Sequence, residues 1–344
     1  MLVRMHWSVL DQSPAKQGQS EDAAIRDTLA LARLCDELGF HRYWLSEHHN
    51  SGALAGTAPE ILVAAIAATT QRIRVGSAGV MLPHYSALKV AEQFRVLEAI
   101  APGRIDLGVG RAPGADRHTA MALNPHSNAH EDFPRQVLEL QAWLTGARLP
   151  AEHPFRDIVA HPRGPSSPEV WILGSSDYGA QLAAHFGLPY AFAYFFSDGR
   201  GVEQALSLYR RNFQPSERHS RPVATICVWA LAANTEAEAR LLLASRELWR
   251  VNLDKGGIRD PLAPPEQAAA HPYSEAERRL IQGIREQALV GTAAQVAVKL
   301  RQLATELQLD EIVINTWTFD EAARSLSYRL LAAALEIRSD ARRA

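Results

Sequence analysis

Short apolar segments alternate with segments of helical periodicity along almost the whole of this 344-residue chain. Such alternation is typical of parallel strands that are joined by right-handed crossover helices. Because eight segments have the character of buried strands and each is followed by a helix, a closed barrel is favoured over an open, doubly wound sheet. We therefore predict an α/β fold, a TIM-like (β/α)8 barrel with insertions. The predicted strands are 7–10, 43–45, 73–80, 104–110, 170–173, 190–195, 223–232 and 311–315.

Two stretches interrupt the alternation, at about 112–168 and at about 254–290. The first ends in a run rich in Pro, Gly and Ser, and the second has several prolines and no clear period over its first half. We interpret both as insertions within a single barrel domain, 1–344, because the alternation resumes directly after each. The predicted helices are 25–38, 57–70, 86–100, 133–144, 178–186, 202–213, 235–253, 274–287, 292–307 and 321–337.

Charge and cysteine content exclude several classes of protein. The formal net charge of -2 provides no basic face, so we expect no nucleic-acid partner. The longest apolar stretch, 61–68, is too short to span a bilayer, so we expect no membrane association. The two cysteines, Cys35 and Cys227, lie inside apolar runs and are expected to be buried thiols in a reducing compartment. These features predict a cytoplasmic protein.

A serine, an acid and two histidines directly follow the second predicted strand, as Ser46-Glu47-His48-His49. The carboxyl ends of the strands are where α/β barrels place their chemistry, and histidine transfers protons near neutral pH. Adjacent residues point to opposite sides of a strand, so one histidine would face the barrel mouth and the other away. We therefore expect one histidine to act as a general base, oriented by Glu47 or a backbone group, and no metal site. An ion-paired histidine without a catalytic role is the alternative.

A second motif, Gly174-Ser175-Ser176, lies between a predicted strand and the helix that follows it. The glycine lets the chain turn and lets a ligand approach the backbone. The free N–H groups and the positive end of the helix dipole there would form a phosphate cradle. Helix capping by the serine hydroxyls alone is the competing interpretation.

Two further strand ends carry candidate ligand-binding residues. Arg111 follows the fourth strand, where its guanidinium would reach a phosphate with two hydrogen bonds, although a surface arginine paired with an acid is the alternative. Ala78 and Gly79, near the end of the third strand, leave room for a flat ligand against the backbone. Composition does not separate that role from tight packing against a neighbouring helix.

Taken in order, these motifs resemble those of the bacterial luciferase-like flavin-dependent monooxygenases. The resemblance covers most of the chain, is strongest over 8–111 and is weakest in the two insertions. The matching segments are 44–49, 73–79, 82–83, 91–92, 103–104, 106–111, 174–176 and 315–317.

The resemblance implies a barrel that binds FMN at its carboxyl-terminal mouth. His48 would be the catalytic acid/base, and Ala78 and Gly79 would support the isoalloxazine, typically through a cis peptide bond. Arg111 and the serine-rich turn with Ser175 and Ser176 would hold the phosphate. The implied reaction uses reduced FMN, supplied by a separate flavin reductase, and dioxygen to insert one oxygen atom into a small organic substrate.

The chain departs from true luciferases in two places. Gly110 stands where luciferases have a reactive cysteine, and 255–273 matches the luciferase lid only loosely, so light emission is not implied. We treat 255–273 as a mobile lid. Four aromatic residues on predicted strands or strand ends are candidates for an apolar substrate pocket, although each is more often core: Trp7, Tyr194, Trp229 and Trp317.

Two alternative functions stay open: a deazaflavin-dependent oxidoreductase of the same fold, and a flavin-binding protein without turnover. Members of this type often associate through helices near the first strands. We therefore expect a homodimer that is formed through the apolar second helix, 61–68.

Overall fold

The computed structural model describes residues 5–126, 129–254 and 260–337. Eight parallel strands close into a barrel in the order β1-β2-β3-β4-β5-β6-β7-β9, and β9 pairs with β1 to complete the ring. This confirms the predicted barrel. The strands are β1 (His6–Asp11), β2 (Arg42–Leu45), β3 (Arg74–Met81), β4 (Ile105–Gly110), β5 (Glu169–Gly174), β6 (Tyr190–Phe192), β7 (Ala224–Ala233) and β9 (Glu311–Asn315).

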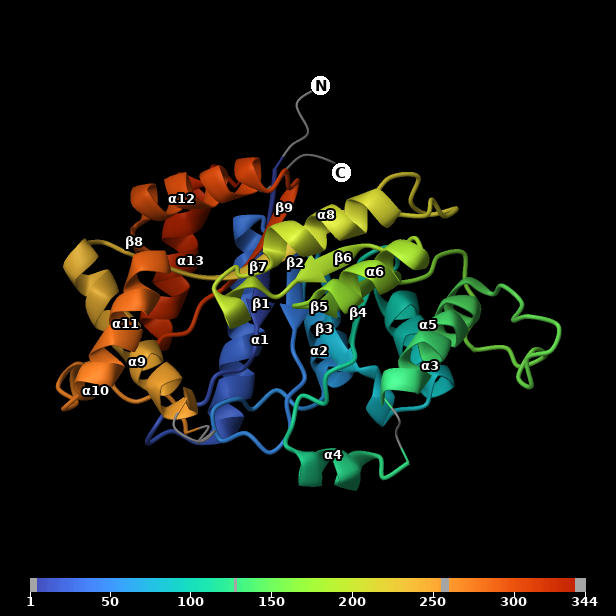
Figure 1. The fold of residues 1–344 in the computed structure, drawn as a ribbon, viewed down its shortest axis with the longest axis horizontal. Coiled ribbons are helices and arrows are strands. Elements are labelled where there is room, and N and C mark those ends of the chain that lie inside the picture. The colour runs from blue at the N-terminus through green and yellow to red at the C-terminus, as the bar shows by residue number, and fades with distance from the viewer. Residues whose placement is uncertain (1–4, 127–128, 255–259, 338–344) are drawn as a thin grey trace.

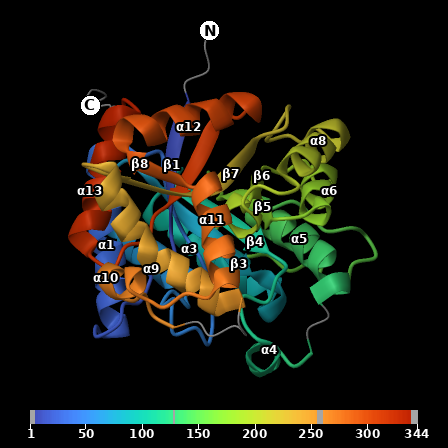
Figure 2. The ribbon, with the colours of Figure 1, turned by 60° about the vertical axis from the view of Figure 1, so that its left-hand side comes forward.

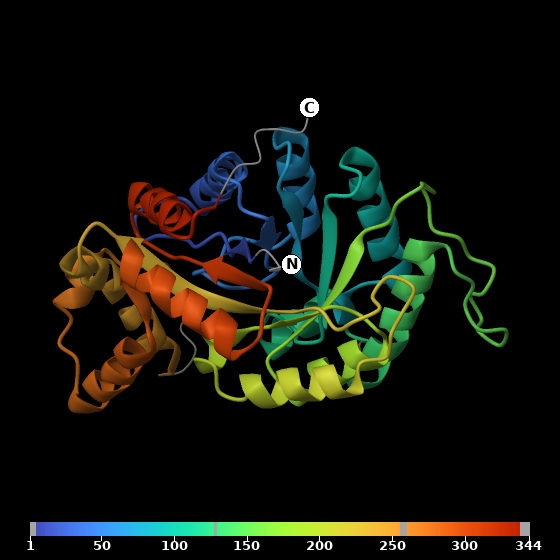
Figure 3. The same cartoon turned by 90° about the horizontal axis from the view of Figure 1, so that it is seen from above.

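Helices surround the barrel, and most of them connect one strand to the next (Figures 1 and 3). The main apolar core lies between these helices and the strands. Local signals in the sequence fix their ends, as where α1 stops at Gly39 in the left-handed conformation, with φ of 88°. The crossover helices are α1 (Glu21–Leu38), α2 (Pro59–Thr69), α3 (Ala87–Ile100), α5 (Ala129–Thr145), α6 (Asp177–His185), α8 (Val202–Asn212) and α12 (Ala293–Glu306); α13 (Glu321–Ala334) follows the last strand.

The insertions contain more regular structure than the sequence suggested. The first contains α4 (Arg117–Leu123), and η1 (Leu82–His84) precedes it in the chain. Between β7 and α12, the predicted helices 235–253 and 274–287 are present as α9 (Glu236–Asp254) and α11 (Glu275–Gln287), and α10 (Pro265–Ala269) lies between them. The last three pack together on one side of the barrel (Figure 2). α10 lies in the stretch that we expected to be irregular, because a five-residue helix is too short to show a period.

Two strands differ from the prediction. A ninth strand, β8 (Leu289–Thr292), pairs with the end of β7 outside the barrel, where we had recognised only the start of the next helix. Thr292 belongs to the strand and also starts the helix, since it is the last residue of β8 and forms a capping box with Gln295 at the start of α12. The predicted strand 190–195 ends at Phe192, because the chain turns there into α7 (Tyr194–Ser197).

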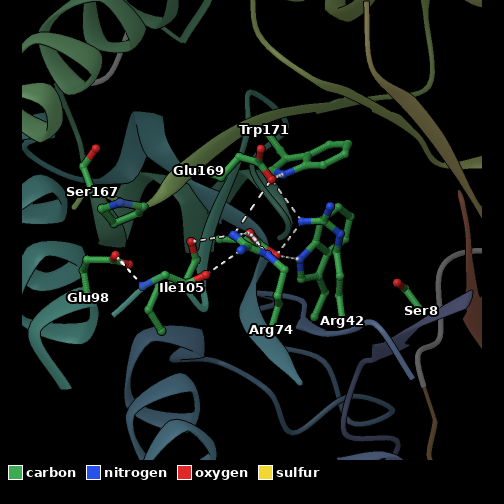
Figure 4. A network of polar contacts seen from close by, with 12 residues as sticks. Ser8, Arg42, Arg74, Glu98, Ile105, Ser167, Glu169 and Trp171 are labelled. Carbon is green, nitrogen blue, oxygen red and sulfur yellow. Dashed lines mark hydrogen bonds and ion pairs between the residues drawn. The ribbon is translucent and has the colours of Figure 1, made fainter. Parts of the chain in front are cut away.

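Five charged side chains, which we call the ionic floor, occupy the amino end of the barrel interior (Figure 4): Arg42, Arg74, Asp106, Glu169 and Glu311. Arg42 lies at its centre, with Nη1 3.0 Å from Asp106 Oδ2 and 3.1 Å from Glu169 Oε2, and Nε 2.9 Å from Glu311 Oε1. Arg74 pairs with the other oxygen of Asp106. Four of the five are the first residues of their strands, so the floor connects β2, β3, β5 and β9 through side chains, and β4 through Asp106.

Two indole rings lie directly above the ionic floor. Trp44 donates a hydrogen bond of 3.0 Å to Asp106, and Trp171 donates one of 3.1 Å to Glu169. Their ring centroids are 5.1 Å apart in an edge-to-face arrangement. Each indole follows a floor residue by two positions, as inward-facing residues of a strand must. The interior is therefore filled from the amino end by charges and then by aromatic rings.

Both cysteines are free and buried, as predicted, and burial raises the pKa of each thiol well above its usual value. Across the described residues, we find no helix with the length and apolar character required to cross a membrane.

The ionic floor makes the fold sensitive to acid. Burial raises the pKa of Asp106, but the Arg42 and Arg74 guanidiniums outweigh burial and hold the pKa below its usual value. A carboxyl whose pKa is lower in the folded than in the unfolded chain stabilises the fold at neutral pH. That contribution is lost as the pH falls below about 3.9, the unfolded value, toward the folded one.

We expect Arg42→Met to lower the free energy of unfolding at pH 7 by about 3 to 5 kcal/mol, because it leaves buried carboxylates without their shared cation. Urea unfolding followed by tryptophan fluorescence measures this. Arg26→Met is the control, since Arg26 forms an exposed pair with Asp22 on α1 and its loss should not change the midpoint measurably. Equal midpoints for Arg42→Met and the wild type would show that the floor does not hold the strands.

Candidate active site

One cavity of about 250 Å³ lies above the indole layer, at the carboxyl ends of the strands. Leu10, Trp44 and Cys227 form its bottom. A larger depression of about 800 Å³ lies at the amino end, beside His6 and His41, away from the strand ends that carry the predicted residues. The smaller cavity is lined by all seven residues that we predicted from the sequence: His48, Ala78, Gly79, Arg111, Gly174, Ser175 and Ser176.

The wall formed by β3 is made of small residues. The Ala78-Gly79 peptide bond is cis, and the pairing of β3 with β4 shifts register there. A Cβ on Gly79 would lie 2.6 Å from the carbonyl oxygen of Gly108, so only glycine fits. Gly79 is therefore tightly packed, but against strands β4 and β5 and not against a neighbouring helix as in the alternative that we considered. Both residues also face the cavity, so packing and an open wall occur together.

His48 and His49 point in different directions, as predicted. His48 lines the cavity, with Nδ1 3.1 Å from the Ser46 hydroxyl, and its backbone N–H donates to the carbonyl of Gly56 at 3.0 Å. His49 turns toward Glu47, whose Oε1 lies 2.8 Å from its Nε2. The Ser46 hydroxyl is a partner of this ring that we did not predict, and orientation of the cavity histidine by Glu47 or a backbone group stays a prediction.

Glu47 instead holds the end of β3. It is buried and accepts hydrogen bonds from the Met81 backbone N–H at 3.0 Å and the Tyr85 hydroxyl at 2.8 Å, in addition to its contact with His49. Met81 follows the Ala78-Gly79 wall by two residues. The acid of the motif therefore supports the small-residue wall and His49.

The opposite side of the cavity is polar and cationic. Gly174 ends β5, the exposed hydroxyls of Ser175 and Ser176 follow, and α6 begins at Asp177 with its N-terminus toward this end. Ser176 makes no side-chain capping bond, so capping alone does not account for the two serines. The Arg111 guanidinium stacks on the Tyr178 ring, with Cζ 3.9 Å from the ring centroid. Cation, hydroxyls and helix terminus are the donor set that binds phosphate.

Sequence reasoning missed Tyr178. Its hydroxyl is buried and has no hydrogen-bond partner within the residues that the structure describes. The only available signal was its position two residues after Ser176, in the first turn of the helix. The platform that it forms under Arg111 depends on how β4 and α6 are placed, which the sequence does not display.

The four predicted pocket aromatics do not line this cavity. Trp7 borders the depression at the amino end, and Trp229 and Tyr194 border a separate cavity of about 20 Å³. Trp317 is buried in an apolar cluster at the barrel mouth. The aromatic residues that do line the 250 Å³ cavity with the predicted site residues, besides Trp44 and Tyr178, are Phe133, Phe192, Phe195 and Phe196.

Two further expectations concern metals and the lid. Within 5–126, 129–254 and 260–337, no group of three or more His, Cys, Asp or Glu side chains converges as a metal site requires. Lys255, Gly256 and Gly257 of the predicted lid lie outside the described residues. The remainder of that segment includes α10, and Leu262 bridges to Lys16 beside β1.

The sequence model of the luciferase-like monooxygenases matches residues 3–311. A luciferase-like monooxygenase of Escherichia coli (strain K12) is 43% identical over 325 residues, which cover 94% of this chain and 95% of that protein. The chain belongs to the luciferase-like monooxygenase family. This confirms the resemblance recognised in the sequence and makes the protein an oxidoreductase of a monooxygenase family.

Other family members extend over the same length. The N-acetyl-S-alkylcysteine monooxygenase of Bacillus subtilis (strain 168) is 36% identical over 336 residues, covering 95% of this chain and 97% of that protein. The crystal structure of apo-MsnO8 superposes with a TM-score of 0.87 at 35% identity, covering 98% of this chain and 99% of the other.

More distant structures share the fold alone and hold different cofactors. The oxygenating constituent of 3,6-diketocamphane monooxygenase from Pseudomonas putida, in complex with FMN, has a TM-score of 0.71 at 18% identity, covering 96% and 97% of the two chains. An F420-dependent secondary alcohol dehydrogenase has the same TM-score at 13% identity, covering 96% and 99%. The fold therefore accommodates both flavins and deazaflavins.

Proposed function

We propose that the protein is an FMN-dependent monooxygenase, which uses reduced FMN and dioxygen to oxygenate a small organic substrate. One observation carries this proposal: a single cavity has an anion-binding end, a wall of small residues and a histidine. A flat ring system that ends in a phosphate is complementary to this combination. We further propose that a separate flavin reductase supplies the reduced cofactor.

The donor set fits the phosphate. Arg111, Ser175 and Ser176 would hold it, with the amino end of α6 behind them. The unpartnered hydroxyl of Tyr178 adds a fourth donor to this end of the cavity. A buried polar group without a partner costs free energy, so a ligand that supplies the missing acceptor is favoured here.

The opposite end fits the ring. Ala78 and Gly79 would lie against one face of the isoalloxazine, and Glu47 holds the strand that carries them. We assign proton transfer to Nε2 of His48, because the Ser46 hydroxyl contacts Nδ1 and so fixes the ring in the cavity wall. Apolar side chains, among them Leu173, Phe133 and Phe195, would exclude water from the reacting atoms. The bound cofactor would supply the electrons that activate dioxygen.

Anaerobic titration with reduced FMN and with a reduced deazaflavin tests the proposal directly. We expect tighter binding of reduced FMN, and oxygen consumption on mixing with air. Tighter binding of the reduced deazaflavin would contradict the proposed monooxygenase and favour a deazaflavin-dependent dehydrogenase. Binding of reduced FMN without any oxygenated product from a panel of organic substrates would favour a flavin-binding protein without turnover.

Arg111→Met should weaken binding of FMN about 10- to 100-fold, because a charge-assisted phosphate contact contributes about 1.5–3 kcal/mol. Riboflavin, which lacks the phosphate, is the matched ligand, and its affinity should change far less. Fluorescence titration of both ligands measures the difference. An equal loss for FMN and riboflavin would contradict a phosphate contact.

His48→Ala should slow oxygenation by about 10²- to 10⁴-fold and leave the dissociation constant of FMN nearly unchanged, because it removes a proton-transfer group and no phosphate or ring support. His118→Ala, at an exposed position on α4, is the control and should retain full turnover. Stopped-flow and steady-state assays measure both rates. Unchanged turnover in His48→Ala would rule out the acid/base role.

We also propose a cytoplasmic homodimer. The two free, buried thiols support a reducing compartment. The predicted contact helix, α2, buries Val63 and Ile66 in the core, so its exposed apolar contribution is Ile61, which is 66% exposed. Val96 and Ile100 of the adjacent α3 are about half exposed and extend this face.

Ile61→Lys should shift the protein from a dimer to a monomer at micromolar concentration, because a charge in the centre of an apolar contact must be desolvated. Light scattering coupled to size-exclusion chromatography measures the mass. Val298→Lys places the same charge at an equally exposed position on α12 and should leave the mass unchanged. A monomeric wild type would contradict the dimer.

A further inference from the structure

A second group of aromatic residues lies at the barrel mouth, beside the candidate cofactor cavity. Trp229 is on β7, Trp317 follows β9, and Trp249 is on α9. Trp249 and Trp317 are in edge-to-face contact at 4.8 Å, and all three belong to one apolar cluster, which we call the tryptophan cluster. Arg246, also on α9, places its guanidinium carbon 4.4 Å from the centroid of the Trp229 ring.

Arg246 is a largely buried cation. It is 7% exposed, and no hydrogen bond or ion pair reaches its guanidinium within the described part of the chain. Two acids act on its charge from other pairs: Asp198 is 3.4 Å from Arg250 on the next turn, and Glu247 is 2.6 Å from Arg285. Burial and, to a smaller extent, the charge of Arg250 lower the pKa of Arg246 to about 9, against the opposing charges of Asp198 and Glu247, so the guanidinium still carries its proton at neutral pH.

The indole N–H groups of the tryptophan cluster are hydrogen-bond donors as well. The Nε1 atoms of Trp229, Trp249 and Trp317 are buried and have no hydrogen-bond partner among the described residues. Three indole donors without acceptors therefore lie in one apolar cluster, and the ring of one of them, Trp229, is in contact with the Arg246 guanidinium. Burying such groups without partners is costly, and the species that satisfies them is an anion with several oxygen atoms.

This place is next to the proposed FMN cavity. Arg246 and Trp229 line a cavity of about 20 Å³, which has room for about one water molecule. Phe195 lines both this small cavity and the proposed FMN cavity, so its side chain lies between the two. It lies on α7, a single turn that is followed by Asp198 with φ of 50°. Rotation of Phe195 would join the two cavities.

We propose that Arg246, together with the indole of Trp229, binds the carboxylate of the organic substrate, so that this monooxygenase acts on organic acids. The guanidinium fork matches two carboxylate oxygens, which an ammonium group does not. Phe195 turns aside to admit the carboxylate, while the remainder of the substrate extends toward the proposed ring site. Asp198 faces the same cavity and Glu247 also acts on this guanidinium, but Asp198 is paired with Arg250 and Glu247 with Arg285. Counted with Arg246, these groups keep a formal charge of +1, which favours an anion. The substrate class rests on the proposed function; the anion site itself does not.

A matched pair of probes tests the site without knowledge of the natural substrate. 3-Phenylpropionate and its neutral isostere 3-phenylpropionamide are titrated by calorimetry into flavin-free and FMN-loaded protein. We expect the wild type to bind the carboxylate at least 10-fold more tightly than the amide. Arg246→Gln should remove this preference and leave amide binding unchanged. Arg240→Gln, at an exposed position on the same helix, is the control and should retain it.

Arg246→Lys keeps the charge and loses the fork, so it should retain a reduced preference, and it replaces the glutamine variant if that variant does not fold. A wild type that binds both probes equally, or an Arg246→Gln variant that keeps the preference, would overturn the proposal. Failure of reduced FMN to bind, with the carboxylate preference intact, would overturn only the proposed monooxygenase. Oxygenation confined to uncharged substrates would overturn only the carboxylate site.

Discussion

The shared cation of Arg42 sets the register of the barrel. It joins carboxylates from three other strands at the amino end, and the residues that follow at alternate positions then face the interior in a fixed order. Along β2 and the residues that directly follow it, Arg42 belongs to the floor and Trp44 to the indole layer. Ser46 then contacts the ring of His48, which lines the cavity. A slip by one residue would place Glu47 and His49 in the cavity instead. The position of the proposed acid/base is therefore decided at the opposite end of the strand.

The same alternation of inward-facing residues explains why the charges of the ionic floor lie apart from the candidate cavity. On β5, Glu169 is followed by Trp171, Leu173 and Ser175, so acid, indole, apolar wall and hydroxyl succeed one another toward the mouth. Three carboxylates face two arginines in the floor, and each indole N–H donates to one of the acids. The apolar faces of Trp44 and Trp171 then separate this network from the cavity. The cavity bottom is consequently apolar and suits an uncharged ring better than a phosphate.

Residues at strand ends were predictable because the barrel brings all of its carboxyl ends to one rim. His48, Arg111 and the serine-rich turn needed only the correct assignment of their strands. Residues whose roles depend on a partner far away in the sequence were not predictable. The Ser46 hydroxyl contacts the His48 ring, the Tyr178 ring stacks on the Arg111 guanidinium, and β8 pairs with the end of β7. Two of the aromatic candidates, Trp229 and Trp317, do not line the cavity for the same reason, since they pack with Trp249 and Arg246 of α9.

The rim divides into sectors with different chemistry. β2 to β5 carry the histidine, the small-residue wall and the anion-binding turn, so the proposed cofactor occupies that half. β7 and β9 carry the tryptophan cluster, over which α9 from the segment between β7 and α12 places Arg246. The family resemblance recognised in the sequence is strongest over 8–111 and weakest in the two insertions, the second of which begins where α9 ends. A barrel whose cofactor half is fixed by strands and whose other half is covered by a helix outside the barrel can change substrate without changing its redox chemistry. Substrate choice in this chain is therefore to be sought in α9 and Phe195 rather than around His48.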